Sequence, residues 1–432
     1  MICNNLSVNA EGHLCLAGVD TVRLAQTYGT PLYVMDEDRI RERCRTYRSA
    51  MRDAFGPDAL PLYAGKAAAF RQIYRVMREE GMGIDVVSPG EIYAAASVGF
   101  PMGRAYFHGN NKTDADIAYA LDRRVGCFVV DNREELETLN RMAGERGIRQ
   151  KILLRLTPGI DPHTYDAVAT GKVDSKFGAA IETGQAGELT ALALSLPHVS
   201  LAGFHCHVGS QVFDSDVYLR ACAIMLNFAA EMKAAHGYVT GELDLGGGYG
   251  VRYLESDPEI DIAANIRQVG QALRAQCASL GLPVPAVRME PGRSIVADAG
   301  LTLYTVGTFK QIPGYKNYVS VDGGMTDNPR FALYRSPYTV CIANRMREPA
   351  VLRASVVGRC CESGDILQED VPVPGTVARG DIAAVLTTGA YNYAMSSTYN
   401  RIPRPAMVLL RGGEPTLAVR RETYADLCRN EL

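Results

Sequence analysis

The sequence predicts an α/β fold in which a (β/α)8 TIM barrel is joined to a C-terminal, mainly-β domain. Three observations predict it: eight short apolar runs, the helix-like segments between them, and a change of pattern near residue 300. Each run ends before a cluster of glycine, polar or ionisable residues, and strand ends of this kind meet at one mouth of a barrel. The runs are LPLYAG before Lys66, IDVVS before Pro89, AYFH before Gly109, CFVV before Asp131, KILLRL before Thr157, LAGFHCH before Val208, ELDL before Gly246 and VRME before Pro291.

The segments between the runs carry apolar residues at intervals of three and four, which is typical of amphipathic helices. Parallel strands need crossover helices of this kind. We therefore expect the barrel to span residues 36–300. Three of the helix-like segments are DRIRERCRTYRSAMRDAF, SDVYLRACAIMLNFAAEMKAAHG and DIAANIRQVGQALRAQCASLG.

Short β-rich runs separated by Gly, Pro and Asn turns begin after residue 300 and predict a separate β domain over residues 301–432. At the other end of the chain, NLSVNAEGHLCLAG predicts a β-hairpin, which is followed by a short helix and the strand PLYVM. We expect residues 1–35 to pack with the C-terminal domain and complete it.

Composition narrows the class of protein. A chain of 432 residues with 47% hydrophobic and 22% charged residues fits a barrel of roughly 250 residues plus a second domain. The net charge of −3 favours neither a nucleic-acid nor a membrane partner. Eleven cysteines without a CxxC pair argue against a disulfide framework and a zinc site. Because no signal-like segment and no membrane-length apolar run is present, we expect a cytoplasmic protein.

Chemically active residue types fall at or just past the predicted strand ends. A lysine, an acid, an imidazole, a glycine-rich anion loop and an arginine in one mouth indicate a phosphorylated, electron-withdrawing cofactor. These residues are Lys66, Asp85, His207, Gly246, Gly247, Gly248, Glu290 and Arg293.

Lys66 follows a strand and opens a helix in PLYAGKAAAF. Burial in a barrel mouth should lower the pKa of its ammonium and give the free amine that forms a Schiff base with an aldehyde. The alternative is a solvated lysine in a first helical turn. The glycines at 246–248 could bring N–H groups to a phosphate, since the loop after the seventh strand is a frequent phosphate site. Three glycines can also form a merely flexible turn.

Glu290 ends the eighth run and could hold a proton on a pyridine nitrogen, which keeps the ring a strong electron sink. Arg293 is placed for a phosphate or carboxylate, although a structural Glu–Arg pair is the alternative. His205 and His207 alternate on the sixth strand, so one of them could lie flat on an aromatic cofactor. A metal pair would need further ligands, and the sequence has no HxxxH or HExxH spacing, so we expect no metal.

Cys360, Cys361 and Glu362 precede a Ser-Gly-Asp turn in the predicted β domain. A thiol held in a cleft is a plausible proton donor, whereas the other nine cysteines are expected to be inert, small apolar residues. The residues alone leave the choice between Cys360 and Cys361 open.

Read together, these segments resemble the barrel-type (fold type III) pyridoxal-phosphate decarboxylases, and within them the diaminopimelate decarboxylases. The matching segments occur in the expected order between Leu62 and Pro405. They are YAGKA, GIDVVSPGE, FHGNNKT, GIDPHTYD with GKVDSKFG, HCHVGSQ, DLGGGYG, EPGRSIVADAG, VDGGMTDNPRFALY, CCESGDIL and TTGAYNYAMSSTYNRIPRP.

The resemblance implies pyridoxal 5'-phosphate as the cofactor. Lys66 would bind its aldehyde as a Schiff base, His207 would stack on its ring, and Glu290 would bond to its pyridine nitrogen. Ser210, the glycine loop and Tyr391 would hold its phosphate. The implied cofactor contacts beyond the first three are Asp85, Ser210, Gly247, Gly248, Gly292, Arg293 and Tyr391.

The resemblance also implies the substrate, meso-2,6-diaminopimelate, and the products, L-lysine and CO2, in the last step of lysine biosynthesis. Cys361, the residue before Glu in CESGD, would return the proton to the substrate carbon. In this family the CESGD segment enters the neighbouring subunit's site, which implies a homodimer with shared sites. The implied substrate contacts are Arg293, Arg330, Tyr334, Glu362 and Tyr391.

Fixed contacts to the distal carboxylate of the substrate would select against amino acids that lack this group, because leaving a buried arginine unpaired costs roughly 2–5 kcal/mol. Two positions depart from the family pattern. SPGE stands where SGGE is usual, and Pro329 and Phe331 flank Arg330 where Ile and Pro are usual. Pro329 restricts the backbone of the residue before it and so affects how far the Arg330 side chain can extend toward the substrate.

Three rival interpretations remain. The first is a decarboxylase of ornithine, arginine or a carboxypolyamine on the same fold, against which the FALY and CESGD segments argue. The second is an inactive regulatory homologue, against which the joint presence of Lys66, Glu290 and Cys361 argues. The third is a racemase of the alanine type, which would need a weaker electron sink than Glu290 provides.

Overall fold

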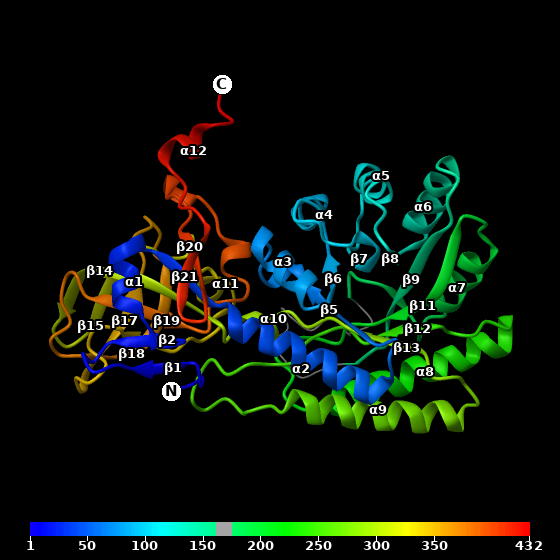
Figure 1. The fold of residues 1–432 in the computed structure, drawn as a ribbon, viewed down its shortest axis with the longest axis horizontal. Helices are drawn as coiled ribbons and strands as arrows, with labels where there is room; N and C mark the ends of the chain where they lie inside the picture. Colours follow the sequence, from blue (N-terminus) through cyan, green and yellow to red (C-terminus); the bar gives the residue numbers. More distant parts are fainter. Residues whose placement is uncertain (161–174) are drawn as a thin grey trace. The chain divides into compact units, whose positions relative to one another are not determined.

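The computed structural model describes residues 1–160 and 175–432 of the chain (Figure 1). The chain forms two compact units, and each is built from more than one stretch of sequence. The barrel unit comprises Arg43–Gly250 and Ile260–Ser294, and the β unit comprises Met1–Glu42, Val251–Glu259 and Ile295–Leu432.

The barrel unit is a closed ring of eight parallel strands. The strands pair in sequence order, and the last of them, β13, pairs back with the first, β5. A short extra strand, β10 (Ala179–Ala180), lies beside β9. The ring strands are β5 (Leu60–Ala64), β6 (Gly83–Val86), β7 (Ala105–Phe107), β8 (Cys127–Val130), β9 (Gln150–Thr157), β11 (Val199–His205), β12 (Glu242–Asp244) and β13 (Ala286–Met289). Each overlaps a predicted run, with ends that differ by up to two residues, so the predicted barrel is confirmed.

The barrel strands are apolar because both of their faces are covered. Every residue of β6 and of β8 is buried, as expected for parallel strands with side chains inside the ring and helices outside it. The helices lie around the ring in Figure 1. They are α3 (Arg71–Glu79), α4 (Pro89–Ala96), α5 (Asp114–Asp122), α6 (Arg133–Glu145), α7 (Gln185–Ser195), α8 (Asp216–His236) and α9 (Ile262–Ser279).

The three longest predicted helices are confirmed as α2 (Glu37–Phe55), α8 and α9. Local signals set their ends. Asp261 accepts the N–H of Ala264 at 2.9 Å at the start of α9, and Gly237 ends α8 with a φ of 66° that glycine adopts without strain. In α4, the family departure SPGE is accommodated because proline stands in the first turn, where its missing N–H has no intrahelical partner.

A polar layer fills the amino-terminal part of the barrel interior. Glu242 of β12 accepts a hydrogen bond from Nη2 of Arg288 at 3.0 Å and pairs with Lys151. Nε of Arg288 also donates to the hydroxyl of Tyr106 at 3.0 Å. Because these charges satisfy one another, the layer supports the ring without offering a reactive group.

The β unit is built around a sheet whose strand order is β18-β17-β15-β14-β4-β20-β21, with β19 pairing to β14 and β16. The N-terminal strand β4 (Leu32–Asp36) lies between β14 and β20, which confirms that N-terminal strands complete the C-terminal β domain. The other strands are β14 (Gly300–Ile312), β15 (Lys316–Val321), β16 (Val340–Ile342), β17 (Ala350–Val357), β18 (Ile366–Pro374), β19 (Ile382–Leu386), β20 (Ala406–Arg411) and β21 (Glu414–Val419).

The predicted N-terminal hairpin is present. Strands β1 (Leu6–Val8) and β2 (Leu14–Leu16) pair antiparallel, and β3 (Val19–Asp20) and α1 (Thr21–Tyr28) follow. Leu14 and Leu16 are buried in the same apolar core as residues of β4, β14 and β20. Burial of these side chains fixes the first strands to the β unit.

In the described part of the chain, no helix has the length and apolar character needed to cross a membrane. All eleven cysteines are free thiols, including the adjacent pair Cys360 and Cys361.

Candidate active site

Lys66 and Asp85 face each other from neighbouring strand ends of the barrel. Lys66 lies in the short helix η1 (Gly65–Ala67), directly after β5, and its Nζ is 3.3 Å from Oδ2 of Asp85 on β6. The Asp85 side chain is fully buried, whereas 43% of the Lys66 side chain is exposed. The prediction that Lys66 is buried is therefore wrong: its neighbour is a carboxylate and its amine is accessible.

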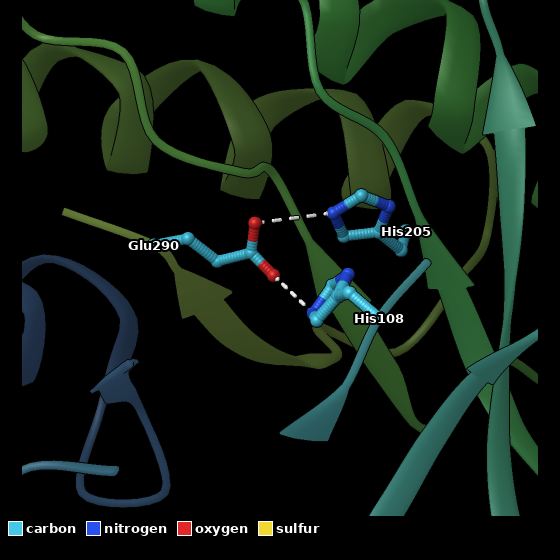
Figure 2. Close-up of side chains that lie close together, drawn as sticks. All are labelled: His108, His205 and Glu290. Carbon is cyan, nitrogen blue, oxygen red and sulfur yellow. Dashed lines mark hydrogen bonds and ion pairs between the residues drawn. The ribbon is translucent and has the colours of Figure 1, made fainter. Parts of the chain in front are cut away.

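The carboxylate of Glu290 lies between two imidazoles (Figure 2). Glu290 directly follows β13, His205 ends β11, and His108 directly follows β7. Nε2 of His108 is 2.7 Å from Oε1 of Glu290, and Nε2 of His205 is 3.3 Å from Oε2. All three side chains are buried. Three strands thus bring one acid and two bases to a single point.

The surroundings of Glu290 favour its ionised form. Burial alone would raise the pKa of this carboxyl, but the imidazoles of His108 and His205 hold the pKa well below its usual range. For Asp244 at the end of β12, burial, followed by the charge of Glu290, raises the pKa well above its usual range. The pKa values of the two neighbouring carboxyls are therefore displaced in opposite directions, that of Glu290 downward and that of Asp244 upward. The ionised Glu290 can hold a positively charged N–H group.

The same three side chains have the residue types of a metal site, and their ligand atoms lie within 4.8 Å of one another. Two atoms bonded to one zinc ion at about 2.0–2.1 Å in a tetrahedron lie roughly 3.3 Å apart. Nε2 of His108 and Oε1 of Glu290 are separated by 2.7 Å, which is a direct contact. The geometry favours an imidazole–carboxylate pair over a metal centre.

His207 lies beyond the strand on which it was expected. Because β11 ends at His205, the predicted alternation does not extend to His207, which lies in the following turn. Burial, and then the positive charge of Lys66, lowers the pKa of His207 well below its usual range. A side chain on Gly246 would place its Cβ only 2.7 Å from Nδ1 of this imidazole. The neutral ring therefore packs closely on the glycine loop.

Ser210, Arg293 and the glycine loop provide groups suited to an anion. Oγ of Ser210 accepts from Nε of Arg293 at 3.3 Å and from Nη2 at 3.1 Å. Gly248 has a φ of 127°, and a Cβ there would lie 2.3 Å from the carbonyl oxygen of Gly209. The glycine is therefore required by close backbone packing rather than by flexibility. Gly247 and Gly292 are similarly packed, against the carbonyl oxygen of Glu290 and the methyl of Ala64.

Lys112, in the FHGNNKT segment, is a structural residue. Its Nζ donates to the carbonyl oxygens of Gly109 at 3.0 Å and Val129 at 2.8 Å, and to the Glu135 carboxylate at 2.8 Å. All three ammonium protons are therefore used within the barrel wall. This leaves Lys66 as the better candidate for a reactive amine.

Three residues that the sequence reasoning missed contribute to the barrel site. His108 and Asp244 flank Glu290 as described, and Arg155 of β9 lies with its guanidinium carbon 4.2 Å from the ring centroid of Phe177. Each is a polar residue at or near the end of an otherwise apolar run. Asp85 was singled out because polar residues at the ends of the apolar runs are expected at the barrel mouth, and the same reasoning could have found these three. The segment 161–174, which carries most of GIDPHTYD and the start of GKVDSKFG, lies outside the described residues.

Arg330 is a buried cation in the β unit. It opens the short helix α11 (Arg330–Tyr334), for which Pro329 is the N-cap. Its Nη1 donates to the hydroxyl of Tyr338 at 2.8 Å and its Nη2 to that of Ser336 at 3.1 Å. Among the residues that the structure describes, no carboxylate pairs with it, so its charge is available to an anionic ligand.

Cys360 and Cys361 differ in exposure. The N–H of Cys360 donates to Asp365 at 2.7 Å, and burial raises the pKa of the Cys360 thiol to about 12. Cys361 is exposed, and its N–H donates to Oδ1 of Asn400 at 2.7 Å. Glu362 and Tyr334 are also exposed, whereas Tyr391 is half-buried with a φ of 60°. In the CESGD segment, the accessible thiol of Cys361 therefore lies beside an acid in the sequence, Glu362, whereas Cys360 is partly buried.

Glu91 makes the free energy of unfolding depend on pH. Its Oε2 accepts the N–H of Val87 at 2.7 Å, and burial raises the pKa of this carboxyl to about 7. Because the folded protein holds this proton more tightly than the unfolded chain, stability is lost as the pH rises from about 4.5 to 7.

We expect Glu91→Gln to increase the free energy of unfolding of the cofactor-free protein by roughly 1–2 kcal/mol at pH 8, and by much less at pH 5. Urea unfolding at both pH values would measure it. The exposed Glu134→Gln variant should show no such difference. An equal effect of Glu91→Gln at the two pH values would contradict the prediction.

Comparison with known proteins agrees with this geometry. The family described as "Pyridoxal-dependent decarboxylase, pyridoxal binding domain" matches residues 37–297. The diaminopimelate decarboxylase of Bacillus subtilis is 44% identical, over 98% of this chain and 96% of its own length. That of Staphylococcus aureus is 40% identical, over 98% of both chains.

Solved structures give the same result. The crystal structure of diaminopimelate decarboxylase from M. jannaschii in complex with L-lysine has a TM-score of 0.91 and 32% identity, and covers 99% of this chain and 98% of that one. The lysine/ornithine decarboxylase of Vibrio vulnificus in complex with putrescine has a TM-score of 0.75 and 25% identity, and covers 94% and 99%. With its barrel, its strand-end residues and these full-length matches, the chain belongs to the diaminopimelate decarboxylase family of pyridoxal-dependent decarboxylases.

Proposed function

We propose that the protein decarboxylates meso-2,6-diaminopimelate to L-lysine and CO2, and that the residues described above carry the reaction. The observation that supports this most is the pairing, in one barrel unit, of an accessible lysine amine beside Asp85 with an ionised carboxylate at Glu290. A decarboxylating site needs both a covalent anchor and a carboxylate that keeps the cofactor's ring nitrogen protonated.

The cofactor of this family is pyridoxal 5'-phosphate, and the barrel residues fit it. The buried carboxylate of Glu290, whose neighbours favour its ionised form, can accept a hydrogen bond from a protonated ring nitrogen. The hydroxyl of Ser210 beside Arg293, and the tightly packed backbone at Gly248, fit a phosphate. The neutral His207 imidazole suits stacking on an aromatic ring.

When bound, the cofactor supplies an aldehyde and a ring that accepts the electrons of the broken bond. The protein's part is to hold and to orient. Lys66 provides the amine, and Glu290 keeps a proton on the ring nitrogen. His207 covers one face of the ring. Asp85 keeps the Lys66 side chain in place through its 3.3 Å contact.

The far end of the substrate would be recognised by the β unit. Arg330 is a buried cation that donates to two hydroxyl groups and lies over the rings of Tyr253 and Tyr338. It would bind the distal carboxylate, and Arg293 and Tyr334 would contribute to the same recognition. Glu362 would bind the distal ammonium, and Tyr391 would contact both substrate and phosphate. Cys361 would deliver a proton to the substrate carbon after CO2 has left, which its exposed thiol permits.

We also propose that the active form is a homodimer in the cytoplasm. Cys361 and Glu362 are exposed on the β unit, as residues that serve a second subunit's site would be in a single chain. Eleven free thiols suit a reducing compartment.

A substrate panel tests the function. Purified protein supplied with pyridoxal phosphate should release CO2 from meso-diaminopimelate and be at least about 100-fold less efficient, by kcat/KM, with ornithine, arginine or a carboxypolyamine. Comparable release from ornithine would favour the first rival interpretation. Binding of the cofactor without CO2 release from any of these compounds would favour an inactive homologue.

Arg330→Ala should raise the KM for diaminopimelate by about 100-fold, or roughly 3 kcal/mol, because the distal carboxylate loses its buried charge partner. The visible absorbance of the bound cofactor should remain. Arg335→Ala, which removes an exposed arginine just past the same short helix, is the matched control. Loss of the cofactor from the Arg330 variant would instead assign that arginine to the phosphate.

A further inference from the structure

His108 takes no part in the roles assigned above, yet it makes the shortest contact to Glu290. Figure 2 shows the His108 and His205 imidazoles on the two oxygens of one carboxylate. The contact from His108 is 2.7 Å and that from His205 is 3.3 Å. His108 is buried, and its own N–H donates to the carbonyl oxygen of Val86 at 2.9 Å, so its backbone is fixed to the barrel wall.

The tautomer of His108 follows from its neighbours. Nε2 lies 2.7 Å from Oε1 of Glu290 and 3.7 Å from Oδ1 of Asp85. Because carboxylate oxygens are hydrogen-bond acceptors, the nitrogen that faces them is assigned the proton of the ring. Asp85 also contacts Nζ of Lys66 at 3.3 Å. Asp85 therefore lies between Lys66 and His108, with the closer contact to Lys66.

His205 contacts the other oxygen of the same carboxylate. Burial lowers the pKa of His205 to about 4, so this ring is neutral at physiological pH. Its contact to Glu290 is the longer of the two. Burial and the charge of Glu290 raise the pKa of Asp244 on the next strand, and its Oδ1 accepts the N–H of Gly246 at 2.9 Å. Each oxygen of the Glu290 carboxylate therefore has one imidazole beside it, His108 at Oε1 and His205 at Oε2.

We propose that His108 is a positioning residue whose Nε2–H holds the Glu290 carboxylate ionised and turned toward the pyridine nitrogen of the cofactor. The inference rests on the proposed function, in which Glu290 bonds to that nitrogen. Without this contact, Glu290 is a buried carboxylate beside Asp244 and Asp85 with one imidazole fewer to offset its charge. The Glu290 carboxylate then rotates or takes up a proton, and the pyridine nitrogen of the cofactor loses its proton.

Two replacements of His108 separate positioning from packing. The amide nitrogen of glutamine lies near the place of Nε2, whereas that of asparagine lies near Nδ1 and falls short of Glu290. His108→Asn should lower kcat by about 10- to 30-fold and change KM by less than about threefold. The lost contact makes the cofactor ring a weaker electron acceptor and leaves the contacts to the substrate in place. His108→Gln should restore most of kcat. His198→Asn, at the other end of β11, is the matched control.

A spectroscopic readout accompanies the kinetics. The positive charge of a protonated ring nitrogen makes the N–H at the bond between Lys66 and the cofactor more acidic. Loss of the ring proton in His108→Asn should therefore raise the midpoint pH of the cofactor's visible band by about one unit. The midpoint in His108→Gln should stay within about 0.3 units of the wild type. The charged or titratable groups around Glu290 are Lys66, Asp85, Arg155, His205, His207 and Asp244, and all are kept unchanged.

Glu290→Gln separates the failure of this inference from failure of the proposed function. If Glu290→Gln leaves the midpoint unchanged, the role of Glu290 is wrong. If it shifts the midpoint and His108→Asn does not, His108 has no positioning role. Should His108→Asn fail to fold, 15N-histidine spectra of the wild-type holoenzyme, assigned with His108→Gln, decide the question. They should show Nε2 of His108 protonated, and an unprotonated Nε2 overturns the inference.

Discussion

Replacing Lys66 by alanine should abolish both the visible absorbance of the bound cofactor and CO2 release. Among the described residues at the strand ends of the barrel, Lys66 has the amine placed to bind an aldehyde covalently and still be displaced by the substrate's amine. Asp85 lies 3.3 Å from this amine, so the variant also leaves a buried carboxylate without its closest cation.

Absorbance spectra, borohydride reduction followed by peptide mapping, and CO2 assays would measure the effect of Lys66→Ala. Lys233→Ala, which removes an exposed lysine from α8, is the control and should retain both signals. Retained absorbance in the Lys66 variant would show that another lysine anchors the cofactor. Lys112 is a poor substitute, because its three protons are bound inside the barrel wall.

Replacing Cys361 by alanine should slow the steps after CO2 release and lower kcat by about 10²- to 10⁴-fold, the usual range for removal of a proton donor. Cofactor binding should be unaffected. Stopped-flow absorbance would follow the slow phase, and product analysis would show whether the proton still reaches the same carbon.

Cys360→Ala is the matched control for Cys361→Ala, because the two thiols are adjacent in sequence and differ in environment. Burial raises the pKa of Cys360 to about 12, and its backbone is tied to Asp365, whereas Cys361 is exposed. We expect less than about a threefold change in kcat for the Cys360 variant. Equal losses in both variants would show that the choice of Cys361 is wrong.

Much of the fold could be predicted from sequence because it depends on local patterns. The eight runs are buried on both faces and so are apolar along their whole length, as CFVV of β8 illustrates. Helices such as α8 and α9 combine a clear apolar period with caps. The strand-end rule then placed Lys66, Asp85 and Glu290 near one another.

Other features depend on contacts that no local pattern encodes. Whether the Lys66 side chain is buried depends on the barrel wall around it, and 43% of it is exposed. The pairing of His108 with Glu290 joins residues 182 positions apart across the ring. His207 lies beyond β11 because the strand ends two residues earlier than the alternation suggested. The contact of Cys361 with Asn400 likewise joins two segments that are 39 residues apart in the sequence.

The central claim is that Lys66 and Glu290 act on the same bound ring, and a crystal structure of the protein with pyridoxal phosphate tests it most directly. We predict a covalent bond from Nζ of Lys66 to the cofactor's aldehyde carbon and a Glu290 oxygen within about 2.6–3.2 Å of the pyridine nitrogen. A cofactor bound elsewhere, or a ring nitrogen that faces a group other than Glu290, would contradict the account.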